Sequence, residues 1–161
     1  MKTDLQRKIV IVDIDGTIAD VRHRLHHIKS GGKKNWKAFF EAMDHDTPID
    51  SVIRQVHELE RDHDIIVVTG RPEHYRQRTE KWLNDNGIRY SRLFMRPDGN
   101  HRPDYTVKAE VLREFPKGRI VLAIDDRGPV CDMWEKNGIR CVRIASDEAN
   151  QQVNELYRKK S

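Results

Sequence analysis

Two pairs of aspartates stand where apolar segments of the sequence end. Asp13 and Asp15 follow the run IVIV, and Asp125 and Asp126 follow the run RIVLAI. Because alternate residues of a strand point to the same side, Asp13 and Asp15 can converge at one edge of a sheet. Adjacent buried carboxylates repel each other unless a cation lies among them, and such hard oxygen ligands suit Mg²⁺. The four aspartates therefore predict a magnesium site.

Residues that suit phosphate binding lie between the two pairs. Thr69, Gly70 and Arg71 follow the apolar segment IIVV, just before a predicted helix. Free backbone N–H groups and a hydroxyl there can bind phosphate oxygens, and Arg71 adds a forked cation. Lys108 lies one helical turn beyond Asp104 and is a candidate to neutralise both a phosphate and a nucleophile. Thr69 alone is better explained as a helix N-cap, so the prediction depends on the joint occurrence of the motifs.

The elements that must position these residues alternate along the chain. Five segments rich in β-branched and apolar residues are predicted strands, over residues 9–13, 65–69, 90–95, 119–124 and 140–144. Segments with helical periodicity lie between them, over residues 48–62, 72–86, 104–115 and 128–137. Since parallel strands need a crossover about as long as a helix, this alternation predicts a three-layer, Rossmann-like α/β domain with a parallel central sheet. Ligands of such sheets bind at the carboxyl ends of the strands.

Residues 20–47 break this alternation. The segment begins with polar residues and then carries Trp36, Phe39, Phe40 and Met43 at helical spacing, so we expect a small, cap-like helical insertion after the first strand. Two interpretations of its aromatic residues remain open: they stack on a base, or they pack on their own domain. No shift in composition marks a second domain, so residues 1–161 are predicted to form one.

The composition excludes several classes of protein. Of the 161 residues, 37% are hydrophobic and 35% are charged. No window has the roughly 18 consecutive apolar residues of a membrane-spanning helix, and the start of the chain shows no secretory pattern, so we expect a cytoplasmic protein. Cys131 and Cys141 lack the spacing of a disulfide framework or a zinc site and are expected to be buried thiols. A net charge of +4 and a pI near 9.1 favour an anionic partner.

The order of the motifs resembles the haloacid dehalogenase superfamily of phosphotransferases. DIDGT, a strand-end Thr-Gly, a lysine and an Asp-Asp pair span residues 13–126 in that family's order. A closer resemblance is to the 3′-phosphatase domains of phage polynucleotide kinase-phosphatases. It rests on LAIDDRGPVCDMW with a following strand that ends in AS, on VVTGR, where that family has serine in place of Thr69, and on the spacing of Arg102, Asp104 and Lys108. This likeness covers most of residues 8–147 and implies a phage or bacterial origin; the insertion diverges, and the kinase motif GxxxxGK[ST] is absent.

The resemblance implies catalytic roles for the acidic residues. Asp13 would be the nucleophile that forms an aspartyl-phosphate, and Asp15 the general acid that later acts as a base on water. Mg²⁺ would be held by Asp13, by the main-chain carbonyl of Asp15, and by one or both of Asp125 and Asp126.

The resemblance also implies how substrate is held. Thr69, the Gly70 amide and Lys108 would bind phosphate oxygens, and Arg24 stands at the spacing from Asp13 of a substrate-contacting arginine. Asp104 would hold Lys108 or Arg102 in place. Arginines suit the further phosphates of a nucleic-acid end; the candidates are Arg24, Arg71, Arg96, Arg102 and Arg127.

The resulting prediction is a Mg²⁺-dependent phosphomonoesterase that removes a 3′-phosphate from nucleic-acid ends or nucleotides in nucleic-acid repair. A separate polynucleotide kinase or ligase is a candidate partner. The first alternative is a nucleotidase or small-metabolite phosphatase of the same superfamily, because the insertion, where the superfamily sets specificity, is the least matched region. A receiver-like signalling module is a more distant alternative, since its acidic pair would be adjacent on the first strand.

Overall fold

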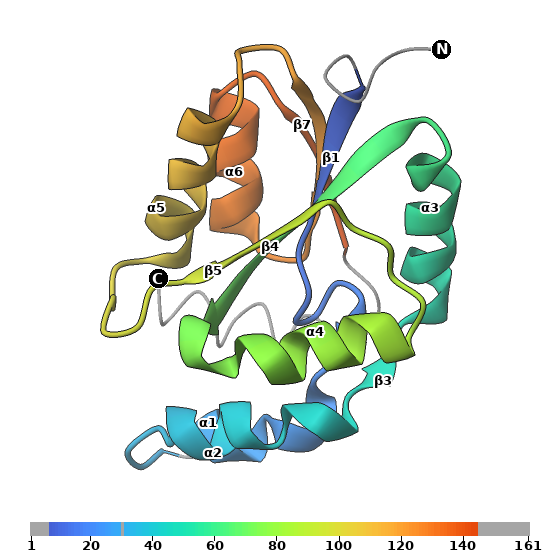
Figure 1. Ribbon diagram of the computed structural model, residues 1–161. Helices are drawn as coiled ribbons and strands as arrows, with labels where there is room; N and C mark the ends of the chain where they lie inside the picture. Colours follow the sequence, from blue (N-terminus) through green and yellow to red (C-terminus); the bar gives the residue numbers. More distant parts are fainter. Residues whose placement is uncertain (1–6, 30, 145–161) are drawn as a thin grey trace.

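The structure of the chain, a computed structural model, describes residues 7–29 and 31–144. Its centre is a five-stranded parallel sheet in the order β5-β4-β1-β6-β7 (Figure 1). The strands are β1 (Lys8–Val12), β4 (His63–Pro72), β5 (Arg92–Arg96), β6 (Ile120–Asp125) and β7 (Arg140–Arg143). Each corresponds to a predicted strand, so the predicted α/β class with a parallel central sheet is confirmed.

Helices cover both faces of the sheet. α3 (Asp50–Glu60) and α4 (Arg76–Asp85) lie on one face, and α5 (Asp104–Ala109) and α6 (Gly128–Lys136) lie on the other (Figure 1). The alternating side chains of β1 explain the two layers, because Val10 and Val12 pack with α3 and α4. Ile9 and Ile11 point the other way and pack with α6 and with the 3-10 turn η5 (Glu110–Glu114) that continues α5.

The helix predicted over residues 72–86 starts later than expected. Pro72 is the last residue of β4, pairs with Arg96 of β5 and has an extended ψ of 146°. A 3-10 turn, η4 (Glu73–Tyr75), then precedes α4. The proline therefore ends a strand here and does not begin the helix, because the extended backbone of β4 continues through it.

The insertion lies beside α4 at the end of the sheet toward which β1 runs (Figure 1). It consists of β2 (Ala19–Asp20), the 3-10 turn η2 (Arg22–Arg24), α1 (His26–Lys29), α2 (Trp36–Glu41), the 3-10 turn η3 (Met43–His45) and β3 (Thr47–Pro48). β2 and β3 pair antiparallel, so a short ribbon that was not predicted forms its base. Phe39 and Met43 are fully buried and join the core that α3 and α4 share.

Some sequence predictions reach beyond these elements. The domain predicted over residues 1–161 extends at both ends past the described residues, and Ala145 and Ser146 of the resemblance lie outside them. Within the described part, no helix has the length and apolar character needed to cross a membrane. Cys131 on α6 is a buried thiol as expected, whereas Cys141 on the edge strand β7 is half-buried, and 2.8 Å separates the two sulfurs.

Candidate active site

The two aspartate pairs meet at the carboxyl edge of the sheet. β1 and β6 are neighbours, and the Asp13 amide donates to the Ile124 carbonyl over 3.0 Å. Carboxylate oxygens of Asp13, Asp125 and Asp126 lie within 4.8 Å of one another, and all three side chains are buried. We call these three residues the carboxylate cluster. The side chain of Asp15 points to arginines instead, as described below.

Gly16 forms the tight turn that lets the two pairs approach. Its φ of 79° lies in the left-handed region that favours glycine. A Cβ at this position would lie 2.3 Å from Asp126 Oδ2. The turn closes through a 2.9 Å hydrogen bond from the Gly16 amide to the Ala19 carbonyl. A side chain at residue 16 would therefore displace Asp126.

Two further side chains connect the members of the carboxylate cluster. Lys108 Nζ donates to Asp13 Oδ1 over 2.9 Å and to Asp125 Oδ2 over 2.7 Å. The Thr17 hydroxyl lies 3.1 Å from Asp13 Oδ2 and 3.3 Å from Asp126 Oδ1, and it can donate to one of them at a time. Lys108 is only 2% exposed, a burial that lysine rarely shows unless it is paired. α5 thus carries an ammonium group into the cluster.

Burial is the largest single influence on the pKa values of Asp13, Asp126 and Lys108. It raises the pKa of Asp13 to about 7; the charge of Asp125 adds to this rise, and Lys108 opposes it. Burial also raises the pKa of Asp126 well above its ordinary value, with the charge of Asp13 as the next cause. Burial lowers the pKa of Lys108, but the carboxylates of Asp125 and Asp13 outweigh this effect and raise it. One ammonium faces three carboxylates, so the cluster lacks positive charge.

The cluster fits a divalent cation. Asp126 Oδ2 is buried and meets no hydrogen-bond donor among the residues that the structure describes, whereas buried polar atoms normally have a partner. Three carboxylates that can offer oxygens within 4.8 Å of one another form a donor set of the kind that Mg²⁺ prefers. A bound dication would lower the pKa of each carboxyl group, because an opposite charge favours the ionised form.

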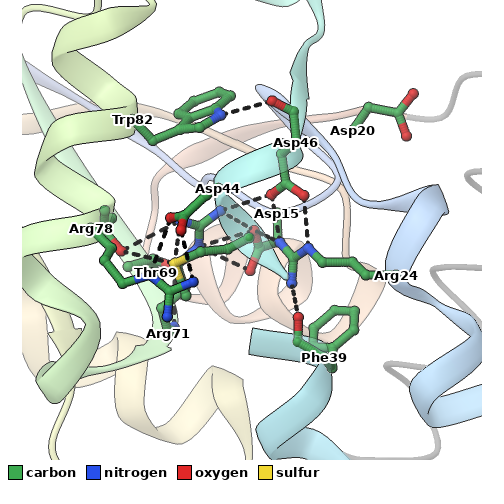
Figure 2. A network of polar contacts seen from close by, with 12 residues as sticks. Asp15, Asp20, Arg24, Phe39, Asp44, Asp46, Thr69, Arg71, Arg78 and Trp82 are labelled. Carbon is green, nitrogen blue, oxygen red and sulfur yellow. Dashed lines mark hydrogen bonds and ion pairs between the residues drawn. The ribbon is translucent and has the colours of Figure 1, made fainter. Parts of the chain in front are cut away.

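Asp15 lies in a second network beside the cluster (Figure 2). Its Oδ1 accepts hydrogen bonds from Arg24 Nη2 at 2.8 Å and from Arg71 Nη2 at 2.7 Å. Burial raises the pKa of Asp15, but the guanidinium groups of Arg71 and Arg24 together outweigh it and lower the pKa to about 2. Arg24 and Arg71 are themselves fully buried. In this arrangement Asp15 is ionised, and both arginines are engaged by carboxylates.

Asp46 completes this network, and the sequence analysis did not identify it. Its buried carboxylate accepts hydrogen bonds from Arg24 at 2.8 and 2.7 Å and from Arg71 at 3.2 Å, and it lies 2.6 Å from His23 Nε2. Trp82 Nε1 of α4 donates to the Asp46 carbonyl over 2.9 Å (Figure 2). Asp46 stands between η3 and β3 in a polar stretch, 22 and 25 positions from its arginine partners. No periodic pattern marks a pairing of that kind.

Thr69 and Gly70 lie at the end of β4, next to the cluster. Thr69 is buried, and its Oγ1 accepts a hydrogen bond from the Arg71 amide at 3.2 Å. A Cβ on Gly70 would lie 2.5 Å from Asp104 Oδ1. Glycine at residue 70 therefore lets the end of β4 pass close to the first residue of α5.

Asp104 has different partners from those predicted. It forms ion pairs with Arg96 and Arg127, and all three side chains are buried. Arg102, one of the predicted partners, is exposed and pairs with Glu110 at 2.5 Å. Asp104 affects Lys108, the other predicted partner, through its charge, which helps to raise the pKa of the lysine. The reason is position: Arg96 ends β5 and Arg127 follows β6, so both strand ends point their guanidinium groups at the start of α5.

These networks enclose a recess with a groove beside it. The recess is lined by the side chains or backbone of Asp13, Asp15, Phe40, Thr69, Gly70, Asp104 and Arg127. It therefore brings together Asp13, Asp15, Thr69 and Gly70, as predicted from strand-end positions. The predicted substrate-binding residues Arg24, Arg71, Arg102 and Lys108 are not among its lining residues.

Comparisons with known proteins agree with this geometry. Residues 7–149 match the family described as the phosphatase domain of polynucleotide kinase PNKP. A protein of Autographa californica nuclear polyhedrosis virus, described as a candidate bifunctional polynucleotide kinase/RNA ligase, is 29% identical over 133 residues. That match covers 80% of this chain and 18% of the viral protein, so the chain spans less than a fifth of this relative.

Solved structures share the fold. A chain in the structure of the Pnkp1/Rnl/Hen1 complex has a TM-score of 0.70 and 27% identity, over 86% of this chain and 46% of that chain. A haloacid dehalogenase-like family hydrolase from Streptococcus pneumoniae has a TM-score of 0.61 over 92% of this chain and 91% of its own, and its 11% identity shows the fold alone. With a family match over residues 7–149 and the two aspartate motifs meeting in one carboxylate cluster, the chain belongs to the PNKP phosphatase-domain family of haloacid dehalogenase-type phosphatases.

Proposed function

We propose that this phosphatase uses Mg²⁺ to remove the 3′-phosphate from nucleic-acid ends or nucleotides. The observation that carries the proposal is the carboxylate cluster of Asp13, Asp125 and Asp126, one member of which faces a recess lined by Thr69 and Gly70. The family match supports the phosphatase chemistry. The names of the relatives, a polynucleotide kinase/RNA ligase and a Pnkp1/Rnl/Hen1 complex, support a polynucleotide substrate and partners in end repair.

Asp13 is the nucleophile in this proposal. One of its oxygens attacks phosphorus, and an aspartyl-phosphate forms as the 3′ oxygen leaves. Lys108 keeps Asp13 in place through Oδ1 and brings positive charge to the phosphate. Mg²⁺, held by Asp13 with Asp125 and Asp126 and by the main-chain carbonyl of Asp15, would offset the repulsion between the carboxylates and the phosphate.

Asp15 supplies and then takes up the proton. It lines the same recess, and its ionised form is the one that accepts a proton from the water that hydrolyses the aspartyl-phosphate. The first step requires the protonated form, which donates to the leaving 3′ oxygen. While Asp15 is protonated, Arg24 and Arg71 interact mainly with the carboxylate of Asp46, to which both are already hydrogen-bonded. The arginines thus act on the reaction through Asp15, and their direct contact with substrate stays a prediction.

Thr69 and Gly70 hold the transferred phosphate in the proposal. The Thr69 hydroxyl and the Gly70 amide lie at the recess, where they can donate to phosphate oxygens. Behind Gly70, one carboxylate of Asp104 faces the two guanidinium groups of Arg96 and Arg127. These guanidinium groups bring positive charge to that side of the recess, which supports phosphate binding there.

The test measures phosphate release from a 3′-phosphorylated oligonucleotide in Mg²⁺ and after EDTA. EDTA and Asp13→Asn should each abolish turnover, and Asp15→Asn should slow it by orders of magnitude. Asp132→Asn is the matched control, because Asp132 is exposed on α6 away from the recess.

Three outcomes would contradict parts of the proposal. Substantial Mg²⁺-dependent activity in Asp13→Asn would show that the nucleophile is another residue. A clear preference for free 5′-mononucleotides would favour a nucleotidase. Lasting phosphorylation of Asp13 without turnover would indicate a receiver-like module.

A further inference from the structure

A groove adjoins the catalytic recess. It has a volume of about 730 Å³ and shares Phe40 and Gly70 with the recess, so the two are continuous. Its walls come from three segments that are distant in the sequence: α2 of the insertion, the end of β4 with η4, and the loop between β5 and α5. A ligand with its phosphate beside Asp13 therefore has space for the rest of its body in this groove.

Aromatic rings and prolines line the groove. The rings of Trp36 and Phe40 are stacked, with centroids 6.1 Å apart, and Phe40 lies 5.7 Å from Tyr75. Pro72 and Pro97 add rigid apolar surface. Trp36 is only half-buried, and Lys34 Nζ lies 5.8 Å from its ring centroid. Flat apolar ligands stack well on such a surface.

Phe39 does not contribute to this surface. Its side chain is fully buried, and the guanidinium carbon of Arg24 lies 4.3 Å from its ring centroid. Of the aromatic residues singled out in the insertion, Trp36 and Phe40 thus face the groove, and Phe39 packs in the core.

The charges at the groove are compatible with a phosphodiester chain. Its acidic residues are paired, since Glu41 accepts a hydrogen bond from Arg78 at 2.7 Å and Asp98 lies 2.6 Å from His74 Nδ1. Lys37, which is exposed, also lines the groove. Pairing weakens the repulsion that acidic groups would exert on a phosphate, and a lysine attracts one.

We infer that this groove binds the 3′-terminal nucleoside of the substrate, with its base stacked on Trp36. The inference rests on the proposed function and adds which part of the substrate the protein recognises beside the phosphate. The volume falls in the range of about 300–1,000 Å³ typical of sites for small ligands. Because stacking uses the flat face that every base has, the groove selects a nucleobase over a sugar or aliphatic group without selecting among bases.

The test compares two 3′-phosphorylated oligonucleotides that differ only in the 3′-terminal nucleotide, which carries adenine in one and is abasic in the other. Both keep the same phosphates, so their ratio of kcat/KM measures the contribution of the base. We expect the wild-type protein to prefer the adenine substrate about tenfold, mainly through KM. Trp36→Leu, which keeps apolar volume and removes the ring, should lose this preference, and Trp36→Phe should retain most of it.

Two controls accompany the variants. Tyr105→Leu changes an aromatic residue of α5 that is 38% exposed and does not line the groove, so the preference should persist. Glycerol 2-phosphate has no ring, so its hydrolysis by the wild-type protein reports the phosphatase chemistry without any contribution from a base. The comparison of the two oligonucleotides in wild-type protein needs no variant and stands even if Trp36→Leu folds poorly.

The outcomes separate this inference from the proposed function. Equal kcat/KM for the two oligonucleotides in wild-type protein, or an unchanged preference in Trp36→Leu, would overturn the inference and leave the 3′-phosphatase in place. Hydrolysis of glycerol 2-phosphate but of no 3′-phosphorylated oligonucleotide would overturn the proposed function, and the inference with it.

Discussion

Asp46→Asn removes one charge from the buried network around Asp15 and keeps the shape of the side chain. The Asp46 carboxylate is fully buried and accepts three hydrogen bonds from guanidinium groups, two from Arg24 at 2.8 and 2.7 Å and one from Arg71 at 3.2 Å. In the variant both arginines share the single carboxylate of Asp15, and the new amide turns a donor toward groups that are themselves donors.

The expected cost follows from burial. Removing one partner of a buried ion pair typically lowers the free energy of unfolding by about 3–5 kcal/mol, because the remaining charge stays desolvated. In a chain of this length each kcal/mol lowers Tm by about 2–4 °C, so Tm should fall by about 6–20 °C. Activity should change as well. Both arginines would interact with Asp15 alone and keep it ionised, so the proposed proton donation would be slower. We therefore expect kcat to fall with little change in KM.

Denaturant and thermal unfolding measure the stability, and turnover of a 3′-phosphorylated oligonucleotide measures kcat and KM. Asp44→Asn is the matched control, two positions away and also labelled in Figure 2. The side chain of Asp44 is 54% exposed and pairs with Arg78 at 3.0 Å. Because exposed ion pairs contribute little, Asp44→Asn should change the free energy of unfolding by no more than the error of the measurement. A loss below about 1 kcal/mol for Asp46→Asn, or equal losses for the two variants, would refute the idea that a buried charge balance holds this network together.

Three further predictions concern the cluster and the recess. Because burial raises the pKa of Asp13 from 3.8 to about 7, its neutral form stabilises the folded state fully below pH 4, and this stabilisation is lost as the pH rises to 7. The Tm gain from Mg²⁺ over EDTA should therefore be larger at pH 7.5 than at pH 5, and equal gains would contradict the assignment. Gly16→Ala places a Cβ 2.3 Å from Asp126 Oδ2 and should abolish that Mg²⁺-dependent gain, as thermal unfolding with and without Mg²⁺ would show. Gly70→Ala places a Cβ 2.5 Å from Asp104 Oδ1 and should weaken inhibition by inorganic phosphate, and an unchanged inhibition constant would speak against phosphate binding at Gly70.

The sheet and the cluster were accessible from the sequence because both depend on local patterns. Buried parallel strands are continuous apolar runs, and acidic residues that follow two such runs meet once the strands pair. Burial of Lys108 among the aspartates agrees with its place between the motifs. Pro72 shows the limit of a local rule, because the residue suits both a first helical turn and the extended end of β4.

The network around Asp15 was not accessible in this way. Arg24 and Asp46 come from short, irregular elements of the insertion, and Arg71 comes from β4, so tertiary packing alone brings them together. The β2–β3 ribbon at the base of the insertion has two residues in each strand, which is too short to show alternation. These are the parts where long-range contacts, and not periodicity, determine the structure.

The two aspartates of DIDGT acquire opposite properties from these surroundings. Asp13 belongs to a cluster in which three carboxylates face one ammonium, and its pKa is raised to about 7. Asp15 belongs to a network in which two carboxylates, its own and that of Asp46, face two guanidinium groups, and its pKa is lowered to about 2.

The proposed function places Mg²⁺ and the phosphate according to this difference in surroundings. The carboxylate cluster has one ammonium group for three carboxylates and fits the dication of the proposed function, whereas guanidinium groups already engage the carboxylate of Asp15. On the far side of the recess, Asp104 pairs with the guanidinium groups of Arg96 and Arg127, on the side where the proposed function places the phosphate. The insertion therefore does more than cover the site, because Arg24 and Asp46 give Asp15 an environment different from that of Asp13. Exchanging the insertion for one without these two residues should impair the proton transfer proposed for Asp15, even where Mg²⁺ still raises Tm through the carboxylate cluster.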